Sequence, residues 1–183
     1  MQEWITFVIG TLLLAYISRA SLRAARSHGF CRFLAWELML LLFTRNLDSW
    51  HDAPAAWNQT LSGILMSLSL FLVLIGYLSL QQFGRQDDRR DDGAALLDFE
   101  KTTALVTHGI YRLIRHPMYD SLMAMAAALF FKQISWLNLA LALLACALLV
   151  LAALIEEREN TRYFGEPYRE YMQQSKRFVP FLL

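Results

Sequence analysis

Apolar residues gather in five runs along the chain, separated by segments rich in charged and polar side chains. The runs cover approximately residues 4–16 (continuing to 20), 30–43, 61–80, 119–131 and 136–155. A helix needs about 20 residues to cross a lipid bilayer, and the third and fifth runs come close to that length. The second and fourth are shorter and would need tilt, local thinning of the bilayer or help from their flanks. The pattern predicts an all-α integral membrane protein with about five transmembrane helices.

Composition agrees with this prediction. Of the 183 residues, 56% are hydrophobic, and the mean hydropathy is +0.33, which is too apolar for an ordinary soluble domain of this size. The length allows one domain, residues 1–183, which we divide into an N-terminal helical hairpin (1–58) and a core (59–183). The first residues carry no basic segment of the kind that precedes a cleaved signal peptide, so we expect the first run to be retained.

Basic residues are distributed unevenly between the two sides of the predicted bundle. Of the 17 Lys and Arg residues, only Arg45 and Lys132 fall on one side; the others lie near the first connection, between runs three and four, and in the C-terminal tail. Cytoplasmic loops carry such an excess, so we expect the N-terminus outside and a cytoplasmic C-terminal helical tail. A bacterial inner membrane or an equivalent membrane, with its lipids as partners, fits this bias. The net charge of +1 gives no reason to expect a nucleic-acid partner.

The stretch 105–119 concentrates polar side chains between two apolar runs. It contains two histidines, two tyrosines and two arginines, and it ends at the start of the fourth run. Pro117 suits the first turn of a helix, where its missing N–H is not needed. The free N–H groups of that turn, next to His116, could hold a carboxylate or a phosphate. The alternative is a charged helix start with arginines that extend toward the membrane surface.

A second polar group, Glu156-Glu157, closes the fifth apolar run. One carboxylate could face a bound cation and the other water; the alternative is a solvated helix end, which the helix dipole disfavours. The helix is expected to continue to Phe164, because Gly165 is a natural C-terminal stop. Pro167 would then start a short last helix.

Two further acidic features have structural alternatives. The loop 84–93 contains Asp-Asp-x-x-Asp, which can hold Mg²⁺ against a pyrophosphate, but interspersed arginines favour a solvated charge run. Glu37 lies inside the second apolar run, where an ionisable group is a functional candidate. A structural pair with Arg32 or Arg45 is the other interpretation.

The motifs together resemble a known family. They are Gly109-x-Tyr111-x-x-x-Arg115-His116-Pro117-x-Tyr119, followed by Glu156-Glu157, Phe164-Gly165, Tyr168, Tyr171 and Pro180. In this order, flanking two apolar runs, they resemble the isoprenylcysteine carboxyl methyltransferase family and the wider group of phospholipid and small-thiol methyltransferases. The resemblance covers about residues 60–183.

The resemblance implies a membrane-embedded S-adenosylmethionine site that opens to the cytoplasm, within residues 59–183. The cofactor-binding residues that it implies are Thr103, Ala104, Leu105, Val106, Tyr111, His116, Pro117, Met118, Tyr119 and Glu156. The ammonium and sulfonium groups of this cofactor suit a carboxylate and aromatic faces, and its carboxylate suits a helix N-terminus. An amine or hydroxyl acceptor would need a general base, for which Glu157 is the candidate catalytic residue. No metal ion is expected.

The acceptor is expected to be a hydrophobic small molecule, a lipid-like molecule or a lipidated (prenylcysteine-like) group at the cytoplasmic face. Two positions depart from the family pattern: Ser121 replaces a glycine, and Ala152 replaces the arginine that binds a prenylcysteine carboxylate. The oligomeric state is left open. Two alternatives remain: an NADPH-dependent membrane reductase related to sterol reductases, whose C-terminal pattern is related, and a non-enzymatic membrane partner protein, which Ala152 favours.

Overall fold

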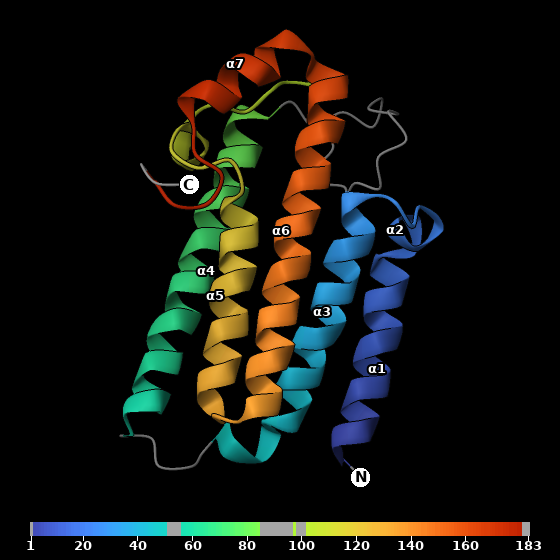
Figure 1. Cartoon of the computed structure of the whole chain (residues 1–183), viewed down its shortest axis with the longest axis vertical. Helices are drawn as coiled ribbons and strands as arrows, with labels where there is room; N and C mark the ends of the chain where they lie inside the picture. Colours follow the sequence, from blue (N-terminus) through green and yellow to red (C-terminus); the bar gives the residue numbers. More distant parts are fainter. Residues whose placement is uncertain (1, 51–55, 85–96, 98–101, 181–183) are drawn as a thin grey trace.

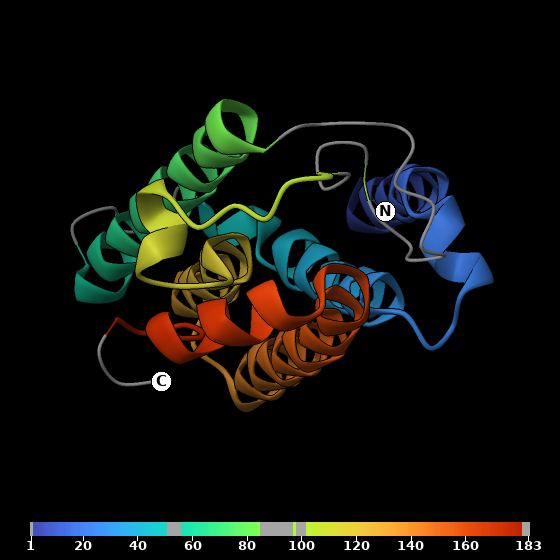
Figure 2. The ribbon, with the colours of Figure 1, turned by 90° about the horizontal axis from the view of Figure 1, so that it is seen from above.

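The protein is a bundle of antiparallel helices, seen in a computed structural model that describes residues 2–50, 56–84, 97 and 102–180. Figure 1 shows the long helices side by side, and Figure 2 shows α7 lying across one end of them. The long helices are α1 (Gln2–Ile17), α3 (His28–Arg45), α4 (Trp57–Phe83), α5 (Pro117–Lys132) and α6 (Trp136–Phe164). The short ones are α2 (Arg19–Arg23), η1 (Leu47–Trp50), η3 (Gly109–Arg112) and α7 (Glu166–Gln174). No strand occurs among the described residues.

Each predicted apolar run lies in one long helix, so the all-helical prediction is confirmed. Two helices, α4 and α6, are long and apolar enough to cross a membrane, and α1 contains a shorter apolar helix. The structure therefore supports two of the five predicted spans by length and composition. As predicted, α6 continues to Phe164, Gly165 ends it with φ of 67°, and Pro167 lies in the first turn of α7.

Some sequence predictions fall outside the described residues. They concern the acidic loop from residue 85 onward, four of the basic residues between α4 and α5, and the last three residues of the tail. The four basic residues are Arg85, Arg89, Arg90 and Lys101.

Large apolar side chains are exposed along three of the long helices. On α4 they include Ile64, Leu70, Phe71, Leu74 and Leu78, each more than half exposed, with similar side chains on α1 and α6. Monomeric soluble proteins rarely expose contiguous apolar surface on this scale. In the hydrocarbon core of a lipid bilayer this exposure has no free-energy cost, so the surface indicates association with a membrane.

Small side chains allow α3, α5 and α6 to approach one another closely. Ala35, Ala126, Ala145, Ala152 and Ala153 are all fully buried in the two apolar clusters between these helices. Small residues dominate helix contacts in membranes, since apolar burial gives little driving force there and close packing must supply it.

Polar side chains secure the C-terminal end of α5, opposite to α7. The last carbonyl groups of a helix have no partner within the helix. Here Asn46 donates to the Leu129 carbonyl at 2.6 Å, Asn58 to Phe131 at 3.1 Å and Gln59 to Lys132 at 3.0 Å. The start of α4 and the end of α3 are therefore fixed to the end of α5.

The acid inside α3 is bonded to α1. Thr11 Oγ1 donates to Glu37 Oε2 at 2.8 Å, whereas Arg45 Nε donates to Asn138 Oδ1 at 3.4 Å. These contacts give Glu37 and Arg45 different partners, and the other proposed pair, Glu37 with Arg32, stays a prediction. A neutral hydroxyl on the neighbouring helix reaches this carboxyl group, and Arg45 is engaged with α6.

Asn138, which is fully buried on α6, gives a test of these polar contacts. Its amide donates to Asn46 Oδ1 at 3.0 Å and to the Gln133 carbonyl at 2.7 Å. Asn138→Leu leaves both acceptors buried without this donor, so we expect the free energy of unfolding in detergent to fall by about 1 kcal/mol. The control is Ser67→Ala, which removes an exposed hydroxyl that bonds only within α4. Equal stabilities for the two variants would contradict this role of Asn138.

Candidate functional site

One wall of the candidate site is a segment that packs closely on the end of α4. Gly109, at the start of η3, has φ of +64°, and a Cβ atom there would lie 2.6 Å from Ser79 Oγ. Both the backbone conformation and the contact require glycine. Gly109 therefore sets how near the segment after it comes to α4.

The segment that follows η3 pairs with the tail that follows α7. Arg115 N–H donates to the Lys176 carbonyl at 2.8 Å, and Lys176 N–H donates to the Leu113 carbonyl at 3.0 Å. His116 N–H donates to the Arg177 carbonyl at 3.2 Å. These bonds form a short parallel bridge between Ile114 and Lys176. The bridge brings the guanidinium groups of Arg115 and Arg177 to the same end of α6.

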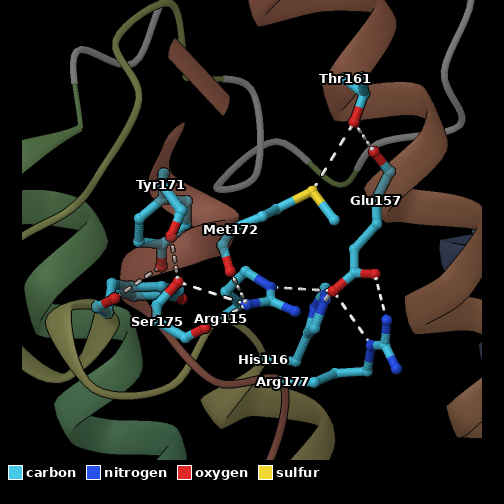
Figure 3. A network of polar contacts seen from close by, with 9 residues as sticks. Arg115, His116, Glu157, Thr161, Tyr171, Met172, Ser175 and Arg177 are labelled. Carbon is cyan, nitrogen blue, oxygen red and sulfur yellow. Dashed lines mark hydrogen bonds and ion pairs between the residues drawn. The ribbon is translucent and has the colours of Figure 1, made fainter. Parts of the chain in front are cut away.

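The Glu157 carboxylate lies at the centre of these cations (Figure 3). Its Oε1 accepts from Arg115 Nε at 2.9 Å and from Arg177 Nε at 3.1 Å, and its Oε2 accepts from Arg177 Nη2 at 2.7 Å. His116 Nε2 lies 3.4 Å from Oε1 without hydrogen-bond geometry. The Glu157 side chain is only 6% exposed, and the carboxylate raises the pKa of the Arg177 guanidinium. This ion cluster joins α6, the start of α5 and the tail.

The tail is held by further bonds around the cluster. Arg115 Nη1 donates to the carbonyl groups of Met172 and Ser175, and Tyr171 Oη donates to the Tyr111 carbonyl at 2.6 Å. Burial raises the pKa of the Tyr171 phenol, and burial also raises that of Tyr168. Both tyrosines therefore stay neutral at physiological pH, and α7 is fixed over the segment that carries Tyr111.

A cavity opens beside the cluster, between α4, α5, α6 and α7. Its wall combines aliphatic side chains, several aromatic rings and a few ionisable groups. The lining residues are Leu80, Thr102, Leu105, Val106, Tyr111, Arg115, His116, Pro117, Met118, Tyr119, Glu156, Asn160, Phe164, Tyr168 and Tyr171. Glu156 is the only acid that the described part of the chain contributes to this wall, although Glu157 is its neighbour in sequence. Adjacent positions on a helix point in directions about 100° apart, so the two carboxylates serve different places.

The structure brings most of the predicted cofactor-binding residues to this cavity. Eight of them line it: Leu105, Val106, Tyr111, His116, Pro117, Met118, Tyr119 and Glu156. Thr103, Ala104 and Glu157 are not among its lining residues, because Thr102 and Leu105 take the wall positions and Glu157 faces the ion cluster. The role of each residue stays a prediction.

Several lining residues were not predicted as site residues. Asn160 and Phe164 follow Glu156 at intervals of four, so helical spacing alone could have identified them. Arg115, Tyr168 and Tyr171 were recognised only as parts of the motifs. Leu80 has no sequence signal, because it reaches the cavity only through the packing of α4.

The fold and the cavity define a helical protein with a membrane-compatible surface and a polar, aromatic-lined site at one end. The model of the phospholipid methyltransferase family matches residues 57–167, which span α4 to the start of α7. The chain therefore belongs to this family, which includes the isoprenylcysteine carboxyl methyltransferases. The resemblance predicted from the motifs is confirmed. Comparisons with curated proteins and with solved structures give no match.

Gly109→Ala tests the close approach of the wall to α4. The new methyl group clashes with Ser79 Oγ and the residue is strained at positive φ, so we expect the free energy of unfolding to fall by about 2 kcal/mol. Gly63→Ala is the matched control, because no atom lies within 4 Å of a Cβ there, and alanine favours the helix. Thermal denaturation in detergent measures both. A Gly109→Ala protein as stable as the Gly63→Ala protein would contradict this packing.

Glu157→Gln tests the ion cluster. The substitution keeps the size of the side chain but leaves Arg115 and Arg177 without their shared anion, and we expect a loss of about 3 kcal/mol in the free energy of unfolding. Glu166→Gln is the control, because its 3.0 Å pair with Arg169 is more than half exposed on both sides. Exposed pairs contribute less than about 1 kcal/mol. Similar denaturation curves for both variants would argue against the cluster as an anchor.

Proposed function

We propose that this protein is a membrane methyltransferase that uses S-adenosylmethionine and transfers its methyl group to a lipid-like acceptor. The membership of the family supports methyl transfer, and one observation carries the choice of cofactor site. A single carboxylate, a histidine, a helix N-terminus and several aromatic rings converge on one cavity at the end of α6. These groups match the separate chemical parts of the methyl donor.

Each chemical part of the methyl donor can be assigned to particular residues of the cavity wall. Glu156 supplies the anion for the ammonium of the donor, and His116 with the N-terminus of α5 suits its carboxylate. The rings of Tyr111 and Tyr168 offer faces to the sulfonium charge. Aliphatic side chains of the wall, such as Leu105, suit the adenine ring. Each group has a partner of appropriate polarity among the lining residues.

When bound, the donor would supply an electrophilic methyl group to the acceptor, and its sulfur would keep the electron pair of the carbon–sulfur bond. The wall residues orient the reactants and exclude water, which is the main demand of this displacement. A carboxylate or thiolate acceptor has no proton to lose. An amine or hydroxyl acceptor would need a general base, and Glu157, the candidate predicted from sequence, is held behind the wall by Arg115 and Arg177.

The acceptor is proposed to be a membrane lipid or a lipid-like molecule, and a prenylcysteine carboxylate has less support. Ala152, which replaces the carboxylate-binding arginine of that family, is fully buried in the apolar cluster with Cys31 and Ala35. Arg115, the guanidinium of the cavity wall, is engaged by Glu157 and by backbone carbonyl groups.

We place the cavity at the cytoplasmic face, with the N-terminus outside. The described basic residues at the cavity end include Arg112, Arg158, Arg162, Arg169 and Lys176, and the opposite end has Arg45 and Lys132. This excess follows the positive-inside bias of membrane proteins. A bacterial inner membrane or an equivalent membrane is the proposed location.

Calorimetry on the purified protein in detergent tests the proposed cofactor. We expect saturable binding of S-adenosylmethionine and no binding of NADPH, the paired control. Glu156→Gln removes a charge-assisted contact and should weaken binding about tenfold or more, with an unchanged melting temperature. Glu166→Gln, outside the cavity, should bind like the wild type. Binding of NADPH alone would favour a reductase, and binding of neither would favour a non-enzymatic partner protein.

A further inference from the structure

A second hollow lies outside the cavity, at the same end of the molecule. It is lined by Thr107, His108, Arg112, Leu113, Tyr171 and Gln174, and of the described residues it shares only Tyr171 with the cavity. We call it the outer hollow. The Tyr171 hydroxyl donates to the Tyr111 carbonyl, so this residue serves as a partition between the two spaces. The outer hollow therefore has its own set of polar groups.

Hydrogen-bond donors dominate the outer hollow. Arg112 contributes an exposed guanidinium, and His108, Thr107 and Gln174 contribute an imidazole, a hydroxyl and an amide. Among the residues that the structure describes, none that lines the outer hollow is acidic. Two acids at this end of the molecule pair with other arginines: Glu157 pairs with Arg115 and Arg177, and Glu166 pairs with Arg169. A guanidinium fork beside neutral donors is a common arrangement for binding the oxygens of a phosphate.

The rim of the outer hollow is apolar and lies where α4 ends. Phe83, the last residue of α4, stacks on His108 with ring centroids 5.3 Å apart. Phe83 and Leu113 are 39% and 46% exposed. Exposed apolar side chains at the end of α4 and after η3 thus lie beside a cationic hollow. A free anion in water would need only the cationic part of this arrangement.

We propose that the outer hollow binds the phosphate group of an anionic phospholipid, with the acyl chains against the exposed apolar side chains of its rim, Phe83 and Leu113. Arg112 and His108 would hold the phosphate oxygens, and Thr107 and Gln174 would add neutral hydrogen bonds. The proposal rests on the proposed function only for the placement of this end at the cytoplasmic membrane face, where anionic lipids are enriched. It adds a lipid-binding site that is separate from the methyl-transfer cavity.

Lipid-dependent melting of the full-length protein tests this proposal. Phosphatidylglycerol added to the protein in neutral detergent should raise the melting temperature more than phosphatidylcholine does. In a titration with phosphatidylglycerol, Arg112→Gln should lower the apparent affinity about tenfold, which is the loss expected for one charge-assisted contact. Arg112→Lys keeps the charge but loses the forked guanidinium, so its apparent affinity should lie between those of the wild type and Arg112→Gln. Arg162→Gln is the matched control, since Arg162 is exposed at the same end but outside the hollow.

Each other outcome would overturn the proposal. Equal responses to the two lipids would show no anionic-lipid site, and equal losses in Arg112→Gln and Arg162→Gln would indicate general surface charge. An equal response to inorganic phosphate, matched in concentration, would assign the hollow to a free anion. Binding of S-adenosylmethionine, measured on the same samples, should be unchanged in Arg112→Gln. That readout separates a failure of this site from a failure of the proposed function.

Discussion

The arrangement of the site depends on one buried carboxylate. Glu157 accepts hydrogen bonds from Arg115 and Arg177, which approach it from segments that precede α5 and follow α7. A buried charge is tolerable only with such partners, so the carboxylate, the start of α5 and the tail are stable in one mutual arrangement. The position of His116, and with it one side of the cavity, follows from that arrangement.

The adjacent residues Glu156 and Glu157 have different partners, because neighbouring positions on a helix point in different directions. Glu157 turns toward the two arginines, and Glu156 turns toward the cavity, where it is the only acid among the described lining residues. The two arginines bind the Glu157 carboxylate and leave the Glu156 carboxylate available to a ligand. The same division applies to the arginines of the polar stretch: Arg115 is engaged within the protein, whereas Arg112 lies in the outer hollow.

Sequence reasoning predicted the long helices because apolar runs and the stop at Gly165 are local signals. It also predicted most of the cavity wall, since Tyr111, His116 and Tyr119 lie close together in one motif. It placed Thr103 on the wall where Thr102 lies, because the path of a segment without helical periodicity depends on what it packs against. The burial of Glu157 depends on Arg177, which is 20 residues away, and no local pattern reports such a contact. The division between residues 1–58 and 59–183 stays a prediction.

The central claim is that the cavity beside the Glu157 cluster holds the methyl donor. The most direct measurement is ultraviolet cross-linking of S-adenosylmethionine, with its methyl group labelled, to the full-length protein, followed by peptide mapping. The account predicts label on peptides that contain Tyr111, Tyr119 or Tyr168, and loss of that label when excess unlabelled S-adenosylhomocysteine competes. Label confined to α1 and α3, or label that the competitor does not reduce, would contradict it.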